Sequence, residues 1–316
     1  MSRLARAREW AVSARDFLRP LPRSGPSVPS APALPPGRCV NVTGRGETFV
    51  REAAAPPEAP PGAPAIVLLH GWTLSADLNW FSGVYEVASR RGRMVAPDLR
   101  GHGRGLRSEE PFTLEAAADD VAGLLRDLDL GPAVVVGYSM GGSVALLLAN
   151  AHPELVAGLV LASTALQWRS SQRERAMWAA LEGIEYTLRL NVHEAVADRY
   201  LRHATLRSPQ LVRFQSWLKA EARRGDPADI AAAGRALALH DARDLAPGIN
   251  VPTVAVITCH DQLIVPEKQR EMVRAIPGAL AVEVDGAHNA WMAKAREWVA
   301  AVDQALDMVG RRLTSK

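Results

Sequence analysis

The chain has 316 residues, of which 48% are hydrophobic and 22% are charged, and its formal net charge is +3. This length and apolar content suffice for one large α/β domain with an insertion, and no stretch approaches the ~18 apolar residues of a membrane-spanning helix. Residues 1–24 hold six arginines against one glutamate and one aspartate. The basic charge therefore belongs to this segment, and no Lys/Arg cluster in the rest of the chain indicates nucleic-acid binding.

The first 37 residues are predicted to be a basic extension and a linker rather than part of a core. Segment 1–24 lacks a clean apolar face, which favours a loosely ordered extension, with weak contact to an anionic membrane surface as the alternative. Residues 20–37 are rich in Pro and Ser, as linkers are. The N-terminus has no apolar region typical of a signal peptide, so we expect a cytoplasmic protein.

The rest of the chain alternates between apolar, β-branched runs and amphipathic segments, which indicates a mainly parallel sheet with helices on both faces. Residues 38–165 and 246–316 should form this α/β core, and the long segment 166–245, without a strand signal, should form a helical cap. Strands are predicted over residues 38–42, 48–51, 65–69, 93–96, 133–136, 155–161, 254–258 and 280–284. Helices are predicted over residues 80–90, 113–128, 142–149 and 291–309.

The strongest motif lies between strand 133–136 and helix 142–149, where residues 137–141 read Gly-Tyr-Ser-Met-Gly. Gly-x-Ser-x-Gly at a strand–turn–helix junction predicts a nucleophile elbow, which lifts the hydroxyl of Ser139 out of the sheet. The backbone N–H of Met140, at the start of the helix, would stabilise a developing oxyanion. Taken alone, the motif also fits a glycine-rich turn without a catalytic role.

A base and an acid for this serine follow the last two predicted strands. His288 lies in the loop after strand 280–284, and an imidazole with a pKa near ~6.5 can take the serine proton and return it. Asp261 follows strand 254–258 and lies between the serine and the histidine in chain order, as the orienting acid should. The other position for this acid, after strand 155–161, reads Ser-Thr-Ala and offers no carboxylate.

Strand 65–69 ends in His70-Gly71-Trp72, where the backbone N–H of Trp72 can supply a second oxyanion donor. His70 is interpreted as a residue that shapes this loop, and His260, adjacent to the acid, should point away from the base. The glycine-dense segment 98–105 precedes no helix directly and lacks Gly-Lys-Ser/Thr, so a P-loop is excluded.

Neither a metal nor a cofactor is predicted. No His, Cys, Asp or Glu cluster has metal-ligand spacing, and the two cysteines, Cys39 and Cys259, do not make a disulfide framework. Both cysteines lie in or beside predicted strands, so we expect buried free thiols. Five large side chains of the insertion could pack the cap or line a pocket over the serine, and the sequence leaves both open: Trp168, Met177, Trp178, Tyr186 and Trp217.

Together these motifs resemble the α/β-hydrolase superfamily, over residues 38–309. The resemblance implies an eight-stranded sheet under a helical cap, with Ser139, Asp261 and His288 as the catalytic triad. Haloalkane dehalogenases and epoxide hydrolases use an aspartate where this chain has Ser139, which argues against both. One departure from the family pattern is Arg104, which stands where a small hydroxyl residue is common.

The sequence therefore predicts a serine hydrolase that cleaves a small, apolar carboxylic ester through an acyl-enzyme intermediate and needs no cofactor. Three other reactions on the same triad stay open: carbon–carbon bond hydrolysis, haloperoxidase-type perhydrolysis and acyl transfer. A ligand-binding protein built on a hydrolase fold is the alternative without catalysis.

Overall fold

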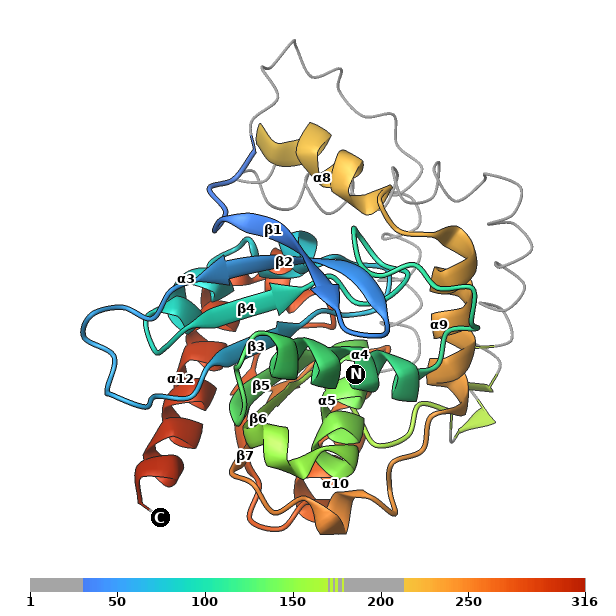
Figure 1. Ribbon diagram of the computed structural model, residues 1–316. Helices are drawn as coiled ribbons and strands as arrows, with labels where there is room; N and C mark the ends of the chain where they lie inside the picture. Colours follow the sequence, from blue (N-terminus) through green and yellow to red (C-terminus); the bar gives the residue numbers. More distant parts are fainter. Residues whose placement is uncertain (1–30, 170, 173, 176–177, 179–212, 316) are drawn as a thin grey trace.

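The computed structural model describes residues 31–169, 171–172, 174–175, 178 and 213–315 (Figure 1). The basic segment 1–24 lies outside these ranges, as do Met177 and Tyr186 of the insertion. Among the described residues, no helix combines the length and the apolar character needed to cross a bilayer.

Eight strands of the described chain form one sheet in the order β1-β2-β4-β3-β5-β6-β7-β8. The hairpin β1–β2 is antiparallel and β2 pairs antiparallel with β4, whereas every pair from β4 to β8 is parallel. The predicted eight-stranded, mostly parallel sheet is therefore confirmed. The strands are β1 Gly37–Val42, β2 Gly46–Ala53, β3 Ile66–Leu69, β4 Met94–Pro97, β5 Ala133–Tyr138, β6 Val156–Ala162, β7 Thr253–Thr258 and β8 Leu280–Val284.

Helices cover both faces of the sheet (Figure 1). On one face lie α4 Leu114–Asp127, α5 Met140–Ala151 and α10 Pro266–Ala275, and on the other lie α3 Val84–Ser89 and α12 Ala295–Thr314. Strand β5 is buried along its whole length, and its successive residues alternate between the two apolar layers. Val135 packs with the first layer and Val136 with the second, because side chains of a strand point to opposite faces.

Two predicted helices are each divided in the structure. The helix predicted over residues 80–90 is shorter in the structure: α3 covers Val84–Ser89, Trp80 is the last residue of α2 Ala76–Trp80, and Gly83 between the two helices has a φ of 127°. The predicted helix 291–309 consists of α11 Ala290–Ala293 and α12, since Lys294 leaves the helical conformation at φ −133° and ψ 50°. Two short 3₁₀ turns, Pro153–Leu155 and Ala246–Gly248, complete the regular elements described.

The expectation of two buried thiols is wrong. Cys39 is exposed and Cys259 is half-buried, although both are free thiols. Strand β1 lies at the edge of the sheet, and its alternating pattern turns Val40 and Val42 inward and Cys39 outward.

Between β6 and β7, the described part of segment 166–245 contains α8 Gln215–Ala222 and α9 Pro227–Leu239. One backbone hydrogen bond ties the start of α9 to the core, and another, just beyond its end, ties the two flanks of the insertion together. The N–H of Asp226, its N-cap, donates to the carbonyl of Gly101 at 2.8 Å, and the N–H of Ala242 donates to the carbonyl of Leu166 at 2.7 Å. This helix therefore has a fixed position over the loops that follow β3 and β4.

Candidate active site

The three residues predicted as the triad meet at one edge of the sheet. Ser139 follows β5, Asp261 lies three residues beyond β7, and His288 lies four residues beyond β8. These strands are parallel, so their carboxyl ends lie at the same edge, where α/β folds place their ligands. The structure brings all three side chains into hydrogen-bond contact.

Ser139 sits in a sharp turn between β5 and α5, with φ 54° and ψ −115°. This left-handed conformation is strained for a residue with a Cβ atom, and such strain is concentrated at functional sites. The flanking glycines allow the turn: a Cβ at Gly137 would lie 2.3 Å from the carbonyl oxygen of Gly141, and one at Gly141 would lie 2.1 Å from that of Leu69. The chain can adopt this sharp turn because both positions are glycine, since no larger residue would fit at either one.

A chain of hydrogen bonds links the three side chains. The Oγ atom of Ser139 lies 3.0 Å from Nε2 of His288, and Nδ1 of His288 lies 2.7 Å from Oδ2 of Asp261. When Nδ1–H donates to the carboxylate, Nε2 is left to accept the serine proton. Ser139 is only 3% exposed, so the reaction it could undergo is shielded from bulk water.

Asp261 is held in place on both oxygens, and its carboxylate is fully buried. Oδ1 accepts the backbone N–H groups of Leu263 and Ile264, both at 2.9 Å, and Oδ2 also accepts the hydroxyl of Thr258 at 2.8 Å. These bonds fix the position of the carboxylate, and the carboxylate in turn orients the imidazole of His288.

Two polar side chains that support Asp261 were missed by the sequence analysis. Gln269, on α10, donates to the hydroxyl of Thr258 at 3.0 Å and to the carbonyl of Ile264 at 2.7 Å. Ser163, at the alternative acid position, lies 3.1 Å from the same threonine hydroxyl. Nothing in the sequence pattern distinguishes a buried glutamine from other polar residues of a helix. The position after β6 was considered only for a catalytic acid, and Ser163 was set aside there because it has no carboxylate.

Tyr138, the residue before the nucleophile, was also missed. Its hydroxyl donates to the carbonyl of His288 at 2.5 Å, and the two ring centroids are 5.3 Å apart. On its other side the ring packs so closely against Gly71 that a Cβ there would lie 2.8 Å from it. One buried side chain therefore contacts both the loop of the histidine and the loop after β3. An aromatic residue inside the Gly-x-Ser-x-Gly motif was the available signal.

The first turn of α5 and the loop after β3, which carry the two predicted oxyanion donors, both lie against Ser139. Met140 is the first residue of α5, and the first N–H groups of a helix have no intrahelical partner. On the other side, the N–H of Gly71 donates to Oδ1 of Asn79 at 3.0 Å, and a Cβ on Gly71 would lie 3.3 Å from the Cβ of Ser139. Trp72 follows Gly71 directly, so its N–H belongs to the peptide group next to this contact.

The other histidines near the site have structural roles. His70 is fully buried, its Nδ1 atom donates to the carbonyl of Gly71, and its Nε2 atom accepts the N–H of Leu99, both at 2.9 Å. Burial lowers the pKa of His70 to about 4, and burial together with the neighbouring His70 lowers the pKa of His102 to about 3. His260 is mostly exposed and lies 2.6 Å from Asp285, away from the triad.

Arg104 fills the loop after β4 with ionic contacts. Its guanidinium lies 2.7 Å from the fully buried carboxylate of Asp77, 3.4 Å from Asp98 and 3.7 Å from Glu221 of α8. It also stacks 3.6 Å above the ring centroid of Phe49. The residue that departs from the family pattern therefore links the core to a helix of the insertion. Burial raises the pKa of Asp98 and of Glu221.

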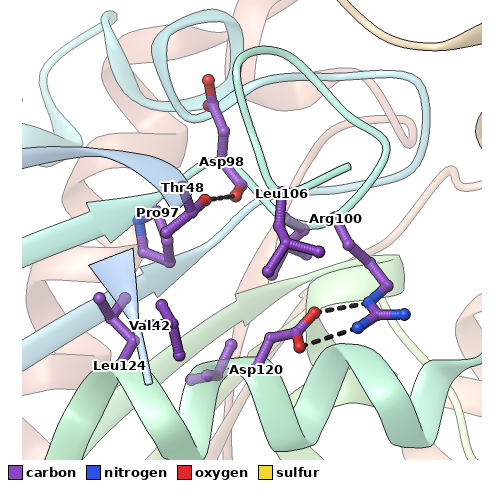
Figure 2. Close-up of a pocket in the computed structure, with 10 residues that line it drawn as sticks. Val42, Thr48, Pro97, Asp98, Arg100, Leu106, Asp120 and Leu124 are labelled. Carbon is purple, nitrogen blue, oxygen red and sulfur yellow. Dashed lines mark hydrogen bonds and ion pairs between the residues drawn. The ribbon is translucent and has the colours of Figure 1, made fainter. Parts of the chain in front are cut away.

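The cavity drawn in Figure 2 is not a substrate site. It lies between the first strands and α4, beside the bidentate ion pair of Arg100 with Asp120 and the bond from the hydroxyl of Thr48 to the carbonyl of Asp98 (Figure 2). Its free volume of about 10 Å³ is about the space one water molecule needs. Within the described ranges, no group of three His, Cys, Asp or Glu side chains could hold a metal ion.

Two tryptophans of the insertion contact residues of the core next to Ser139. Trp168 and Trp178 are buried, with ring centroids 6.0 Å apart, and Trp178 lies 5.9 Å from Trp72. The indole N–H of Trp168 donates to the hydroxyl of Ser143, one turn beyond the nucleophile on α5, at 3.1 Å. Trp217 instead packs against Phe81, at 5.3 Å. Trp168 and Trp178 therefore combine packing with a place beside the site.

Comparisons with known proteins place the fold of this chain among known hydrolases. A curated relative, the pimeloyl-[acyl-carrier protein] methyl ester esterase of Neisseria meningitidis, is 28% identical over 254 residues, which are 79% of this chain and 95% of the relative. An uncharacterized protein of Mycobacterium tuberculosis is 36% identical over 100 residues, but these cover only 29% of its length. The crystal structure of the enol-lactonase from Burkholderia xenovorans aligns with a TM-score of 0.71 at 26% identity, covering 85% of this chain and 100% of that one.

The sequence model of the alpha/beta hydrolase fold matches residues 64–295. These residues include the loop after β3, the elbow and the two loops that carry Asp261 and His288. The chain belongs to the alpha/beta hydrolase family of enzymes.

Proposed function

We propose that the protein is a serine esterase, and that Ser139 attacks the carbonyl carbon of a carboxylic ester to form an acyl-enzyme. One observation carries the proposal: the unbroken chain of hydrogen bonds from Ser139 through His288 to Asp261, at 3.0 Å and 2.7 Å. The name of the Neisseria meningitidis relative, a methyl ester esterase, supports this reaction class.

Each residue has one task in the proposed reaction. His288 takes the hydroxyl proton of Ser139 as the serine attacks, and gives it to the leaving alcohol when the tetrahedral intermediate collapses. Asp261 holds the imidazole in the required tautomer and stabilises its charged form. In the second half, His288 activates a water molecule, which releases the acid and frees Ser139.

The negative charge of the tetrahedral intermediate falls to the backbone N–H groups of Trp72 and Met140. Loss of one such donor costs about 3–4 kcal/mol of transition-state stabilisation in other serine hydrolases. We expect a mostly apolar ester as substrate, because the indoles of Trp72 and Trp178, with centroids 5.9 Å apart, make the surroundings of the loop after β3 apolar. No cofactor is needed for these steps.

The test is hydrolysis of p-nitrophenyl esters from acetate to decanoate by the wild-type protein and by Ser139→Ala. We expect the variant to lose turnover by at least ~10⁴-fold, while Ser89→Ala, at a half-buried serine on α3, keeps it. Full residual turnover in Ser139→Ala would overturn the proposal. A parallel panel of lactones, β-diketones, peracid formation and added alcohols separates ester hydrolysis from carbon–carbon cleavage, perhydrolysis and acyl transfer.

A further inference from the structure

The indole of Trp72 contacts the cap helix α9 in two ways, through a hydrogen bond from its N–H and through close packing of the adjacent ring edge. Its indole N–H donates to the carbonyl of Ile230 at 2.7 Å. The adjacent edge of the ring lies against Gly234, where a Cβ would stand 2.6 Å from Cζ2 and 3.2 Å from Cε2 of the indole. Ile230 and Gly234 are four residues apart, so the indole covers a single turn of the helix.

Glycine is an unfavourable residue in the middle of a helix, and alanine is the most favourable one. Helix α9 is otherwise rich in alanine, with Ala231, Ala232, Ala233, Ala236 and Ala238 around this position. The contact with Trp72 gives a physical reason for the exception: any side chain at position 234 would push the indole away and break its bond to Ile230.

The helix is a rigid support for this contact. Its N-cap is bonded to the carbonyl of Gly101, and a Cβ on Gly101 would lie 2.2 Å from the Cβ of Asp229 on α9. Beyond its C-terminal end, Asp241 forms an isolated β-bridge with Gln167, near the start of the insertion. The ring of Trp178 closes a further side of the Trp72 indole, with centroids 5.9 Å apart. The Trp72 indole therefore lies between α9 and the ring of Trp178. A side chain on α9 that displaced it could not move it towards either of these neighbours.

We propose that Gly234 is a positioning residue for the oxyanion hole, and that α9 sets the place of the Trp72 backbone N–H by gripping its indole. This inference rests on the proposed function, in which that N–H stabilises the tetrahedral intermediate. The insertion then shapes the transition state as well as admitting the substrate, and the contact acts on kcat rather than on KM.

The test is a double-mutant cycle between the two positions, read on an ester that the wild-type protein cleaves. We expect Gly234→Ala to lower kcat by about tenfold with KM within a factor of two, since a displaced donor loses part of the 10²–10³-fold effect of a missing one. In the background of Trp72→Ala, the same substitution should change kcat by less than twofold, because there is no indole to displace. In the background of Trp72→Phe, which keeps a ring but loses the bond to Ile230, the effect of Gly234→Ala on kcat should be intermediate between its effects in the wild-type and Trp72→Ala backgrounds.

Gly310→Ala is the matched control, because Gly310 lies inside α12 and no atom comes within 4 Å of a Cβ there. It should leave kcat and KM unchanged. Equal loss from Gly234→Ala in both backgrounds, or no loss in either, would overturn the inference.

Hydrogen exchange of the backbone in residues 70–74 gives a readout independent of catalysis. Gly234→Ala should speed exchange there and Gly310→Ala should not, and unchanged exchange in the first variant would contradict the grip. If the wild-type protein cleaved no ester but the exchange result held, the proposed function would fail while the contact between α9 and Trp72 stood.

Discussion

The hydroxyl oxygen of Ser139 and the Nε2 atom of His288 lie 3.0 Å apart, although 149 positions separate the two residues in the chain. The parallel sheet creates this relationship, because β5 and β8 end at the same edge with β6 and β7 between them. Tyr138 reinforces it through its bond to the carbonyl of His288. The core therefore holds the hydroxyl of Ser139 and the imidazole of His288 in contact.

Asp261→Asn should lower kcat by about 10⁴-fold with little change in KM. An amide at this position would favour the wrong tautomer of His288, and a replacement of this kind has that effect in an unrelated serine hydrolase. The measurement is steady-state kinetics on a p-nitrophenyl ester. Asp285→Asn, which alters an exposed carboxylate bonded to His260 and Lys294, is the control. A loss below tenfold in Asp261→Asn would contradict the role given to this carboxylate.

Tyr138→Phe should lower kcat by about tenfold and leave KM unchanged, because it removes only the hydroxyl that holds the loop of His288. The ring keeps its packing against Gly71 and Trp298, so thermal unfolding should shift by only a few degrees. Tyr85→Phe removes another buried hydroxyl, bonded to Asp77, and should leave kcat as it is. Wild-type kcat in Tyr138→Phe would show that the bond does not position the base.

Arg104→Ala should reduce the free energy of unfolding by about 3 kcal/mol, because it leaves the buried carboxylates of Asp77 and Glu221 with fewer cationic partners. Urea denaturation measures the change. Arg274→Ala breaks an exposed pair with Glu267 and should cost less than about 1 kcal/mol. Equal losses in the two variants would mean that the buried cluster adds nothing beyond an ordinary surface ion pair.

Two buried histidines should make the fold sensitive to mild acid. The folded-state pKa is about 4 for His70 and about 3 for His102, both below the ordinary 6.5. Their contribution is therefore complete above pH 6.5 and is lost as the pH falls towards 4, since the unfolded chain binds protons first. Each accounts for about 2 kcal/mol between pH 7 and pH 5. Burial raises the pKa of Asp98 and of Glu221, and these two carboxyls act in the opposite direction.

His102→Asn isolates one of these contributions. The loss of unfolding free energy between pH 7 and pH 5 should be about 2 kcal/mol smaller in this variant than in the wild-type protein. An identical pH dependence in His102→Asn and the wild-type protein would rule out a buried neutral His102.

Local signals made the sheet and the meeting of Ser139, Asp261 and His288 predictable. A buried parallel strand is a short apolar run, and the loop that follows it begins at the edge of the sheet where the site lies. The order of these loops along the chain therefore indicated which residues could serve as acid and base. Where a helix would be interrupted was harder to foresee, as at Gly83, because the break depends on a backbone conformation rather than on composition.

The supporting contacts could not be predicted because they join distant segments. Trp72 bonds to a carbonyl 158 positions away, and Tyr138 to one 150 positions away. Backbone carbonyls carry no sequence signature, and Gln269 looks like any polar residue of a helix until β7 and α10 are placed together. The prediction that Cys39 is buried was wrong for a related reason. The position of β1 at the edge of the sheet decides which face of this strand is exposed.

If Ser139 is the nucleophile, a fluorophosphonate probe should react with its hydroxyl. We expect a single covalent adduct on the intact wild-type protein, mapped to Ser139, with none on Ser139→Ala and a labelling rate at least ~10³-fold lower on His288→Ala. Labelling of Ser139→Ala at the wild-type rate, or an adduct mapped to another serine, would contradict this role of Ser139.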